Sequence, residues 1–247
     1  MPILNNVLIQ AKAAGITIVA TDMEITLVAN YEAEVLAEGE ITVSAKRLYD
    51  IIKETPDGVV HVETSQSNVL ILKCQKSVYR INGLSSKDFP KISDGEEGGS
   101  LSLTKVDRQV MIGLIAKTFF AISPDETRVN LTGGFLEVEG EEGKGILRMV
   151  ATDGHRMAIV ESMALKEAMQ LEKGVIIPRK GLLEIRKLVE ENAGDPFVGV
   201  ERNMWVVKIA EMILKVSLID AEFPDYRRVI PKEKGFLFYC TKDEVLH

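Results

Sequence analysis

Long stretches of this sequence occur twice, and this repeat constrains the fold more than any other feature. The matching stretches keep their order and nearly the same spacing: 44–51 (SAKRLYDI) with 178–185 (PRKGLLEI) and 84–90 (LSSKDFP) with 218–224 (LIDAEFP), each 134 positions apart, and VATD at 19–22 and 150–153, 131 apart. Solenoid units repeat every ~20 to 50 residues. The longer interval therefore predicts a whole module that is present twice.

The composition is typical of a globular protein. Hydrophobic residues make up 46% and charged residues 27% of the 247 positions, which are ordinary values. No stretch approaches the ~20 apolar residues that span a bilayer, and the N-terminus lacks the basic-then-apolar pattern of a signal peptide. Two cysteines are too few for a disulfide framework. We therefore expect a cytoplasmic protein that makes no membrane contact.

The charge and histidine content narrow the function further. A net charge of −7 argues against a protein whose whole surface binds nucleic acid, although it leaves room for a local basic track. The three histidines are scattered along the chain. We therefore expect no metal site and no cofactor.

The second copy of the module, residues 100–229, contains the complete pattern. Its first half is expected to be a strand at 100–103, a helix that Thr104 caps and that ends before Pro124, and three strands at 135–139, 147–151 and 157–163. Its second half repeats this order, with a strand at 175–177, a helix at 178–191, and strands at 197–201, 205–209 and 213–218. Two copies of strand, helix and three antiparallel strands, with the helices on one face, predict an α+β fold.

The first copy, residues 1–99, shows the same order from its third element onward. We expect strands at 3–9, 16–20, 25–31 and 41–43, a helix at 45–54, and strands near Val59, Val69 and Val78. The counterpart of 100–128 is expected ahead of Met1. Residues 230–247 read as a linker followed by the opening strand of a third module, so we expect a chain that is truncated at both ends.

The two second-half helices repeat their charges as well as their apolar residues. The charges at i, i+4 and i+7 are the same in both helices: Lys46, Asp50 and Lys53 in one, and Lys180, Glu184 and Lys187 in the other, with Arg47 and Arg179 beside them. Such spacing is typical of an ordinary solvated face. Because the charges are duplicated, a second interpretation stays open, in which the two helices contact phosphates without reading bases.

The motif at 152–157 (TDGHRM) places a histidine close to an aspartate, which can indicate a general base. A catalytic relay needs side chains that can bond to each other and a nucleophile, and adjacent residues on a tight turn do not supply this. The alternative is a turn in which Asp153 binds its own backbone and Gly154 has a positive φ. We therefore expect no catalysis, although a hydrolase built on Asp153 and His155 remains the alternative from another class.

The segment 223–229 (FPDYRRV) is only partly shared between the copies. Phe223 matches Phe89 and is expected to anchor the core in both modules. Tyr226, Arg227 and Arg228 have no counterpart in the first copy. Their function should therefore belong to the second module alone.

Three motifs together resemble one family: 150–158 (VATDGHRMA), 177–181 (IPRKG) and 223–231 (FPDYRRVIP) are similar to the β subunit of bacterial DNA polymerase III, the sliding clamp. The resemblance implies three modules per subunit. It also implies that two subunits close head-to-tail into a ring around duplex DNA, with helices lining the hole. An acidic outer surface would then coexist with basic helices.

The resemblance also implies roles for particular residues. Sequence-independent contacts with duplex DNA fall on Lys46, Arg47, Arg179 and Lys180, and the repeat extends them to Lys53 and Lys187. A cleft for short apolar motifs of the polymerase α subunit, the clamp loader and repair proteins falls on Leu131, Thr152, Gly154, His155, Arg156, Met157, Pro224, Arg228 and Val229. The homodimer interface falls on the edge strand 77–81, with Tyr79 and Ile81 pointing outward. The competing hypothesis is a protein-interaction scaffold that never encircles DNA.

Overall fold

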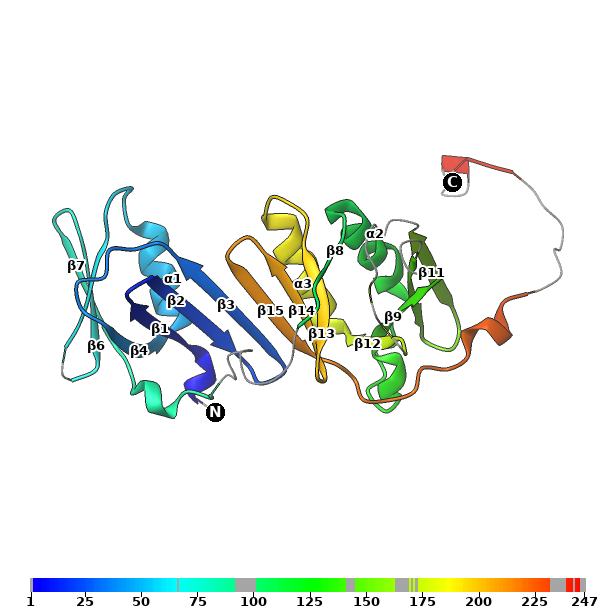
Figure 1. Ribbon diagram of the computed structural model, residues 1–247, viewed down its shortest axis with the longest axis horizontal. Helices are drawn as coiled ribbons and strands as arrows, with labels where there is room; N and C mark the ends of the chain where they lie inside the picture. The colour runs from blue at the N-terminus through cyan, green and yellow to red at the C-terminus, as the bar shows by residue number, and fades with distance from the viewer. Residues whose placement is uncertain are drawn as a thin grey trace.

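The structure is a computed structural model in which two α+β modules lie side by side along the long axis (Figure 1). It describes residues 2–65, 67–91, 101–140, 145–162, 169, 171, 173–231, 239–241 and 243–244. The predicted fold class is confirmed. The stub at 235–247 and the boundary near residue 99 lie largely outside the described residues, so the limits 1–99, 100–229 and 230–247 stay predictions.

Module two contains the predicted double pattern. Its first half consists of β8 (Thr104–Lys105), α2 (Arg108–Thr118), β9 (Gly133–Glu139), β10 (Ile146–Thr152) and β11 (Met157–Ser162). Its second half consists of β12 (Val175–Pro178), α3 (Arg179–Glu191), β13 (Phe197–Glu201), β14 (Met204–Ile209) and β15 (Met212–Ser217). The strands form two antiparallel sheets, β11-β10-β9-β12 and β15-β14-β13-β8. Each sheet thus takes its fourth strand from the other half of the module.

Module one follows the predicted order. A 3-10 turn (Pro2–Asn5) precedes β1 (Asn6–Lys12), β2 (Gly15–Thr21), β3 (Ile25–Tyr31), β4 (Gly39–Ser44) and α1 (Ala45–Glu54), after which come β5 (His61–Thr64), β6 (Val69–Cys74) and β7 (Ser77–Asn82). The strands form β4-β1-β2-β3 and a three-stranded sheet, β5-β6-β7.

One sheet crosses the boundary between the modules. β3 pairs with β15 in antiparallel register, from Ile25 opposite Val216 to Ala29 opposite Met212. Two further backbone bonds extend this contact, including Ser217 N to Glu24 O at 2.8 Å. The result is an eight-stranded sheet, β4-β1-β2-β3-β15-β14-β13-β8, which the repeat alone did not predict.

The core of module two lies where α2 and α3 meet the two sheets. Leu114 of α2 and Ile185 of α3 are at most 1% exposed, and Trp205, the chain's single tryptophan, is fully buried beside them. Burial of such side chains contributes about 1.5 to 3 kcal/mol each. This core holds both helices rigidly against the sheets.

The two second-half helices differ in how completely they are covered. Leu182 and Ile185 of α3 are fully buried, in part because α2 packs on α3. Their repeat counterparts on α1, Leu48 and Ile51, are only partly buried. Among the described residues of module one, α1 is the only α-helix, so its apolar face has less cover.

Several predicted element ends were wrong, each for a local reason. Residues 101–103 are irregular, and the strand is Thr104–Lys105, paired with β13. The cap of α2 is Asp107 rather than Thr104, because its carboxylate accepts hydrogen bonds from the backbone N–H groups of Gln109 and Val110. Pro178 ends β12 and precedes α3 as its N-cap.

Two strand positions in module one also differ from the prediction. The first strand begins at Asn6 rather than Ile3, because a 3-10 turn occupies Pro2–Asn5. The strand expected near Val59 begins at His61, and Val59 itself is 75% exposed. Within the part of the chain that the structure describes, no helix is both long and apolar enough to cross a membrane.

Candidate functional site

The turn between β10 and β11 is fixed by the side chain of Asp153. Its Oδ1 accepts hydrogen bonds from the backbone N–H groups of His155, at 2.9 Å, and Arg156, at 3.0 Å. Its Oδ2 accepts one from Nε of Arg156 at 3.0 Å, and Gly154 has a φ of +87°. The backbone hydrogen bonds, with help from Arg156, lower the pKa of Asp153 to about 2. The predicted structural role of Asp153 and Gly154 is confirmed, since the carboxylate serves the backbone of its own turn.

Arg128 lies beside this turn, and the sequence reasoning did not include it in the site. Its Nη1 donates to the carbonyl of Asp153 at 3.4 Å, and its Nε lies 3.8 Å from the carboxylate of Asp125. The guanidinium of Arg156 lies 5.7 Å from the ring centroid of Phe120, which is 55% exposed. Arg128, three residues before Leu131, therefore extends the exposed polar rim that His155 and Arg156 form.

An apolar cluster lies under this rim, on the face of the sheet β11-β10-β9-β12 that is turned away from the helices. Leu131, Val150, Ile176 and Phe223 are at most 9% exposed, and Met157 packs against them. Two predicted cleft residues, Leu131 and Met157, thus meet on one face, together with Phe223, which precedes the predicted Pro224.

The segment 219–229, which we call the strap, crosses this face. Ile219 forms a β-bridge with Ile176, and the ring of Phe223 stacks on Phe135 with centroids 4.8 Å apart and planes 6° from parallel. Tyr226 follows and is 5% exposed. The strap therefore has a buried side along which it adheres to the sheet.

The exposed side of the strap carries three more predicted residues. Pro224 and Arg228 are exposed, and Val229 is 69% exposed. Arg228 forms an ion pair with Asp225 at 2.9 Å within the strap itself. An apolar side chain at the surface beside a guanidinium suits a ligand that offers both apolar and polar groups.

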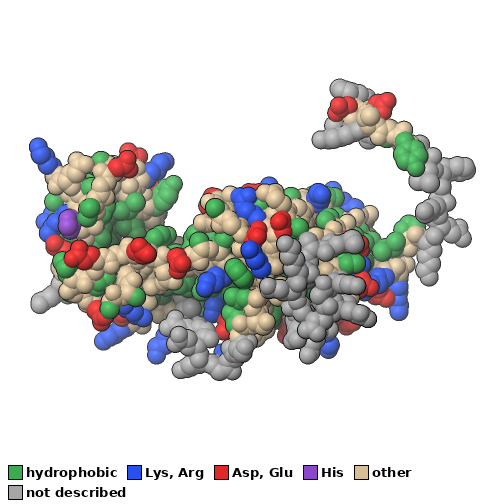
Figure 2. Space-filling view, turned by 45° about the horizontal axis from the view of Figure 1, so that its top comes forward, with side chains coloured by type: hydrophobic (Ala, Val, Ile, Leu, Met, Phe, Trp, Pro, Cys, Tyr) green, Lys and Arg blue, Asp and Glu red, His purple; other side chains and the backbone are tan. Residues whose placement is uncertain are grey.

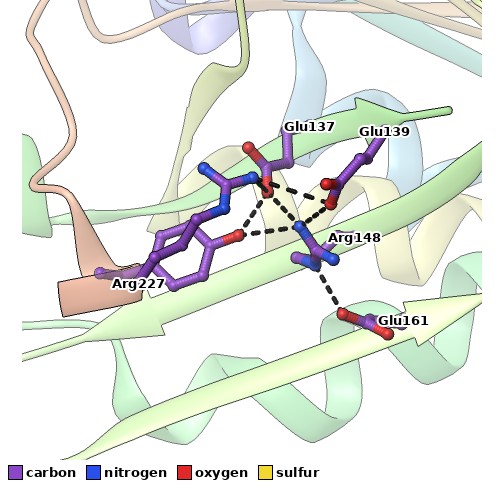
Figure 3. Close-up of polar contacts among 6 residues, drawn as sticks. Glu137, Glu139, Arg148, Glu161 and Arg227 are labelled. Carbon is purple, nitrogen blue, oxygen red and sulfur yellow. Dashed lines mark hydrogen bonds and ion pairs between the residues drawn. The ribbon is translucent and has the colours of Figure 1, made fainter. Parts of the chain in front are cut away.

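An ion cluster joins the strap to the sheet (Figure 3). The guanidinium of Arg148, whose side chain is 12% exposed, binds three carboxylates: Glu137 at 2.8 Å, Glu139 at 2.5 Å and Glu161 at 2.7 Å. Burial opposes the charged form of Arg148, but the three carboxylates outweigh this effect and raise its pKa. The strap adds Arg227, whose Nη2 lies 2.9 Å from Oε1 of Glu137.

Tyr226 completes the cluster. Its hydroxyl donates a hydrogen bond to Glu137 and accepts one from Nη1 of Arg148 at 3.1 Å. Burial would raise the pKa of Glu137, but the hydrogen bonds from Tyr226 and Arg148 outweigh it and keep this pKa below its usual value. Burial and the neighbouring carboxylate raise the pKa of Tyr226. Glu137 and Arg148 therefore keep their charges at neutral pH, and Tyr226 stays a neutral donor.

The candidate DNA-contacting residues lie on two helices that occupy the same place in their modules. All six are exposed: Lys46, Arg47 and Lys53 on α1, and Arg179, Lys180 and Lys187 on α3. On the face shown in Figure 2, basic and acidic side chains are interspersed over both modules. A contact with a polyanion would therefore rest on particular helix positions rather than on a uniform basic surface.

Two of these six residues also make contacts within the chain. Nζ of Lys180 forms a hydrogen-bonded ion pair with Asp22 of module one, which raises the pKa of Lys180. Burial would raise the pKa of Asp22, but the contact with Lys180 and two backbone hydrogen bonds lower it. The guanidinium of Arg179 lies 4.3 Å from the ring centroid of Phe119. Lys180 thus bridges the modules, which the sequence did not predict.

The expected outward orientation of Tyr79 and Ile81 is wrong. β7 is an edge strand, as expected, but Ile81 is 2% exposed and Tyr79 packs against the same core. Side chains alternate along a strand, and the outward positions belong to Val78, which is 49% exposed, and Arg80. A role of the strand at a subunit interface stays a prediction. In the described ranges, no three histidine, cysteine, aspartate or glutamate side chains form a group that could hold a metal ion.

Two protein-family models match the chain. The model of the DNA polymerase III beta subunit, N-terminal domain, covers residues 1–93, and that of the central domain covers residues 105–225. The beta sliding clamp of Caulobacter vibrioides is 35% identical over 245 residues, which are 98% of this chain and 65% of that protein. That of Escherichia coli is 31% identical over 233 residues, or 94% of this chain and 61% of that protein.

Solved structures of similar proteins agree with these matches. The sliding clamp from Caulobacter crescentus superposes with a TM-score of 0.86 at 35% identity, covering 95% of this chain and 63% of that one. A sliding clamp from Bartonella birtlesii bound to griselimycin gives 0.82 at 31% identity, covering 94% and 61%. The chain thus spans 61% to 65% of the length of these relatives.

Proposed function

Because the chain belongs to the DNA polymerase III β subunit family, of which it carries the N-terminal and central domains, we propose that it is part of a DNA sliding clamp. In this function the protein tethers the replicative polymerase and other replication and repair proteins to duplex DNA in the cytoplasm. It contributes binding surfaces and performs no chemistry of its own. The whole clamp is a homodimeric ring, with the open edge of β7 (Ser77–Asn82) as one side of the contact.

The observation that carries the proposal is the position of the basic residues. Lys46 with Lys180 and Lys53 with Lys187 occupy equivalent places on two helices, each held on its module by a packed core. A rigid row of cations of this kind can neutralise phosphates without reading bases. The ion pair of Lys180 with Asp22 lies at the surface. Lys180 can therefore exchange this partner for a phosphate at little cost.

DNA binding can be tested with two charge-matched triple variants. Lys46→Glu/Lys53→Glu/Lys187→Glu changes the helix face, and a control changes three exposed lysines outside α1 and α3, namely Lys12, Lys76 and Lys208. Anisotropy of a fluorescent duplex over a range of salt concentrations measures affinity and its salt slope. The slope is that of log K against log salt concentration. We expect it to fall in magnitude by up to about 0.9 per phosphate contact removed in the helix variant, and by much less in the control. Equal effects of the two variants would contradict DNA binding by the helix face. They would favour a scaffold that does not bind DNA through these helices.

Partner binding can be tested separately at the strap. A short apolar peptide from the tail of the polymerase α subunit should bind the chain in titration calorimetry. Val229→Glu places a charge at a position that is 69% exposed, so the fold tolerates it while apolar contact is lost. Val59→Glu, at a position that is 75% exposed in module one, is the matched control. Equal loss in both variants would remove the strap from the binding surface.

Assembly and catalysis provide two further checks. Light scattering that finds only single chains of 27.3 kDa at high concentration would contradict ring closure by this chain alone. His155→Ala should leave any background hydrolysis unchanged. The reason is that the Asp153 carboxylate accepts a hydrogen bond from the backbone N–H of residue 155 and not from its imidazole. The same substitution should weaken binding of the polymerase-tail peptide. A loss of turnover in this variant would support the hydrolase instead.

A further inference from the structure

The ion cluster around Arg148 is built by strand register. Arg148 of β10 lies directly opposite Glu137 of β9 and opposite Glu161 of β11, so the three side chains form one row across the sheet. Cross-strand pairs of opposite charge stabilise a sheet modestly. Here, however, the sheet supplies three carboxylates, with Glu139, to one guanidinium. The row therefore has an excess of negative charge that a further cation can compensate.

The strap supplies that cation together with a hydrogen-bond donor. Arg227 binds Glu137, and the Tyr226 hydroxyl bonds to both Glu137 and Arg148. These contacts join residues that are 78 to 90 positions apart in the chain. Because Tyr226 is 5% exposed and Arg148 12%, water competes weakly for these hydrogen bonds.

The internal repeat supplies a natural comparison. Register places Gln10, Thr17 and Asn30 of module one at the positions of Glu137, Arg148 and Glu161, and all three are neutral. The apolar cluster, by contrast, is present in both modules, since Phe89 packs with Leu8 and Val19 in module one. Module one thus lacks both the charged row and the Tyr-Arg-Arg-Val sequence. In module one Lys91 follows Pro90, whereas in module two Asp225 follows Pro224.

The cluster lies at the end of the strap that carries exposed site residues. Phe223 fixes the strap on one side of Pro224, and Tyr226 fixes it on the other, two residues before Arg228 and three before Val229. Arg228 pairs within the strap, with Asp225, and the side chain of Val229 is 69% exposed. The orientation of both residues therefore depends on how firmly Tyr226 is held.

We propose that Glu137, Arg148 and Tyr226 form a latch that positions Arg228 and Val229 for partner peptides without contacting the peptide. The latch residues are positioning residues, and this role rests on the proposed function of the strap. The apolar cluster attaches the strap to the sheet, as the corresponding cluster around Phe89 does in module one. The latch then sets the position and orientation in which Arg228 and Val229 meet a ligand. A planar guanidinium suits this task because it can bind several carboxylates and a hydroxyl at once.

Hydrogen exchange of the full chain, without any peptide, tests the latch itself. Arg148→Met removes the guanidinium and keeps an unbranched apolar side chain in place of the aliphatic part, and Tyr226→Phe removes only the hydroxyl. We expect amides at 226–229 to exchange at least tenfold faster in Arg148→Met and less so in Tyr226→Phe, with β15 amides unchanged. Arg148→Lys should restore protection only in part, since an ammonium cannot bind all these partners in one plane.

A second ion pair in module two provides the matched control. Lys215 and Glu201 form a pair of similar burial, 13% and 21% exposed, on a different sheet. Lys215→Met should therefore leave exchange of the strap unchanged. Equal exchange at 226–229 in wild type and Arg148→Met, or equal acceleration in Lys215→Met, would overturn the latch.

The polymerase-tail peptide links the latch to binding. We expect Arg148→Met to weaken peptide binding five- to tenfold and Lys215→Met to leave it unchanged. Faster strap exchange with unaltered peptide affinity would overturn the positioning role. If the wild-type chain does not bind the peptide at all, the proposed function of the strap fails, whereas the exchange data still decide whether the latch holds the strap.

Discussion

Arg108 links the start of α2 to the end of α3, and its removal should cost more stability than that of any surface ion pair in module two. Its Nε donates to the carbonyls of Val189, at 2.8 Å, and Asn192, at 3.1 Å, and its Nη2 donates to the carbonyl of Glu190 at 2.7 Å. The last carbonyls of a helix have no partner within the helix. Arg108 thus caps α3 from a neighbouring helix.

The magnitude follows from the number and burial of these hydrogen bonds. A hydrogen bond to a charged group contributes about 1.5 to 3 kcal/mol when its partner is buried. The bonds to Val189 and Asn192 are partly buried, and the bond to Glu190 is exposed, so water can replace the last one. Because one Nε–H is shared between the carbonyls of Val189 and Asn192, these contacts count as a single three-centre bond, which gives a loss of about 2 kcal/mol for Arg108→Met.

Urea unfolding followed by the fluorescence of Trp205 measures this loss, because that residue is the chain's single tryptophan and is fully buried in the same core. With a slope of about 2 kcal/mol per molar urea, the midpoint should fall by about 1 M. Arg108→Lys should recover part of the loss, since one ammonium replaces a fork of donors.

The control is Arg186→Met, which removes an exposed ion pair between Arg186 and Glu190, both on α3. Such pairs contribute about 0.3 to 0.5 kcal/mol. If Arg108→Met were no more destabilising than Arg186→Met, the carbonyls at the end of α3 would be adequately solvated and the capping role would be refuted.

Three further outcomes are expected. Gly133→Ala should destabilise module two by about 3 kcal/mol in the same urea assay, because the added Cβ would lie 2.4 Å from the carbonyl oxygen of Ile177; a midpoint like that of the wild type would contradict this packing. The carboxyl of Asp153 should titrate near pH 2 by NMR. Its lowered pKa stabilises the fold above pH ~4, and this contribution is lost as the pH falls through 2. A titration midpoint at the ordinary value for aspartate would mean that the turn is not hydrogen-bonded. A thiol reagent should modify exposed Cys240 at once and buried Cys74 only after unfolding, so two fast thiols would mean that the core of module one is open.

The order of elements was predictable because each signal is local. Residues 41–54 contain the signals of a strand, then a helix start, then a strongly amphipathic helix. The predicted helix 45–54 has the same ends as α1. The turn at Asp153 was predictable for the same reason, since its hydrogen bonds span two or three residues.

The orientation of β7 shows where local reasoning failed. Apolar residues occupy positions 78, 79 and 81, so the apolar pattern alone does not decide which face is buried. A shift of one residue exchanges the faces of a strand. Arg80 and Asn82 decide the matter, because their exposure places Tyr79 and Ile81 inward.

The contacts that the sequence did not reveal join residues far apart in the chain. The carboxylates around Arg148 come from two strands and meet only through register. Arg108 reaches carbonyls more than 80 positions away. Lys180 and Asp22 lie in different modules. Neither periodicity nor capping rules carry information about such pairs, whereas the resemblance indicated the segments of the candidate site but not the contacts that hold them.

The pairing of β3 with β15 determines what happens when the chain is cut between its modules. Either module alone would present an unpaired strand rich in β-branched and other apolar residues, ITLVANY from β3 or MILKVS from β15. Natural edge strands are usually protected by charges, prolines or bulges, and the seven residues of β3 carry no charge and no proline. Each module is thus the other's protection against aggregation, and an isolated copy of either should be less soluble than the two expressed together.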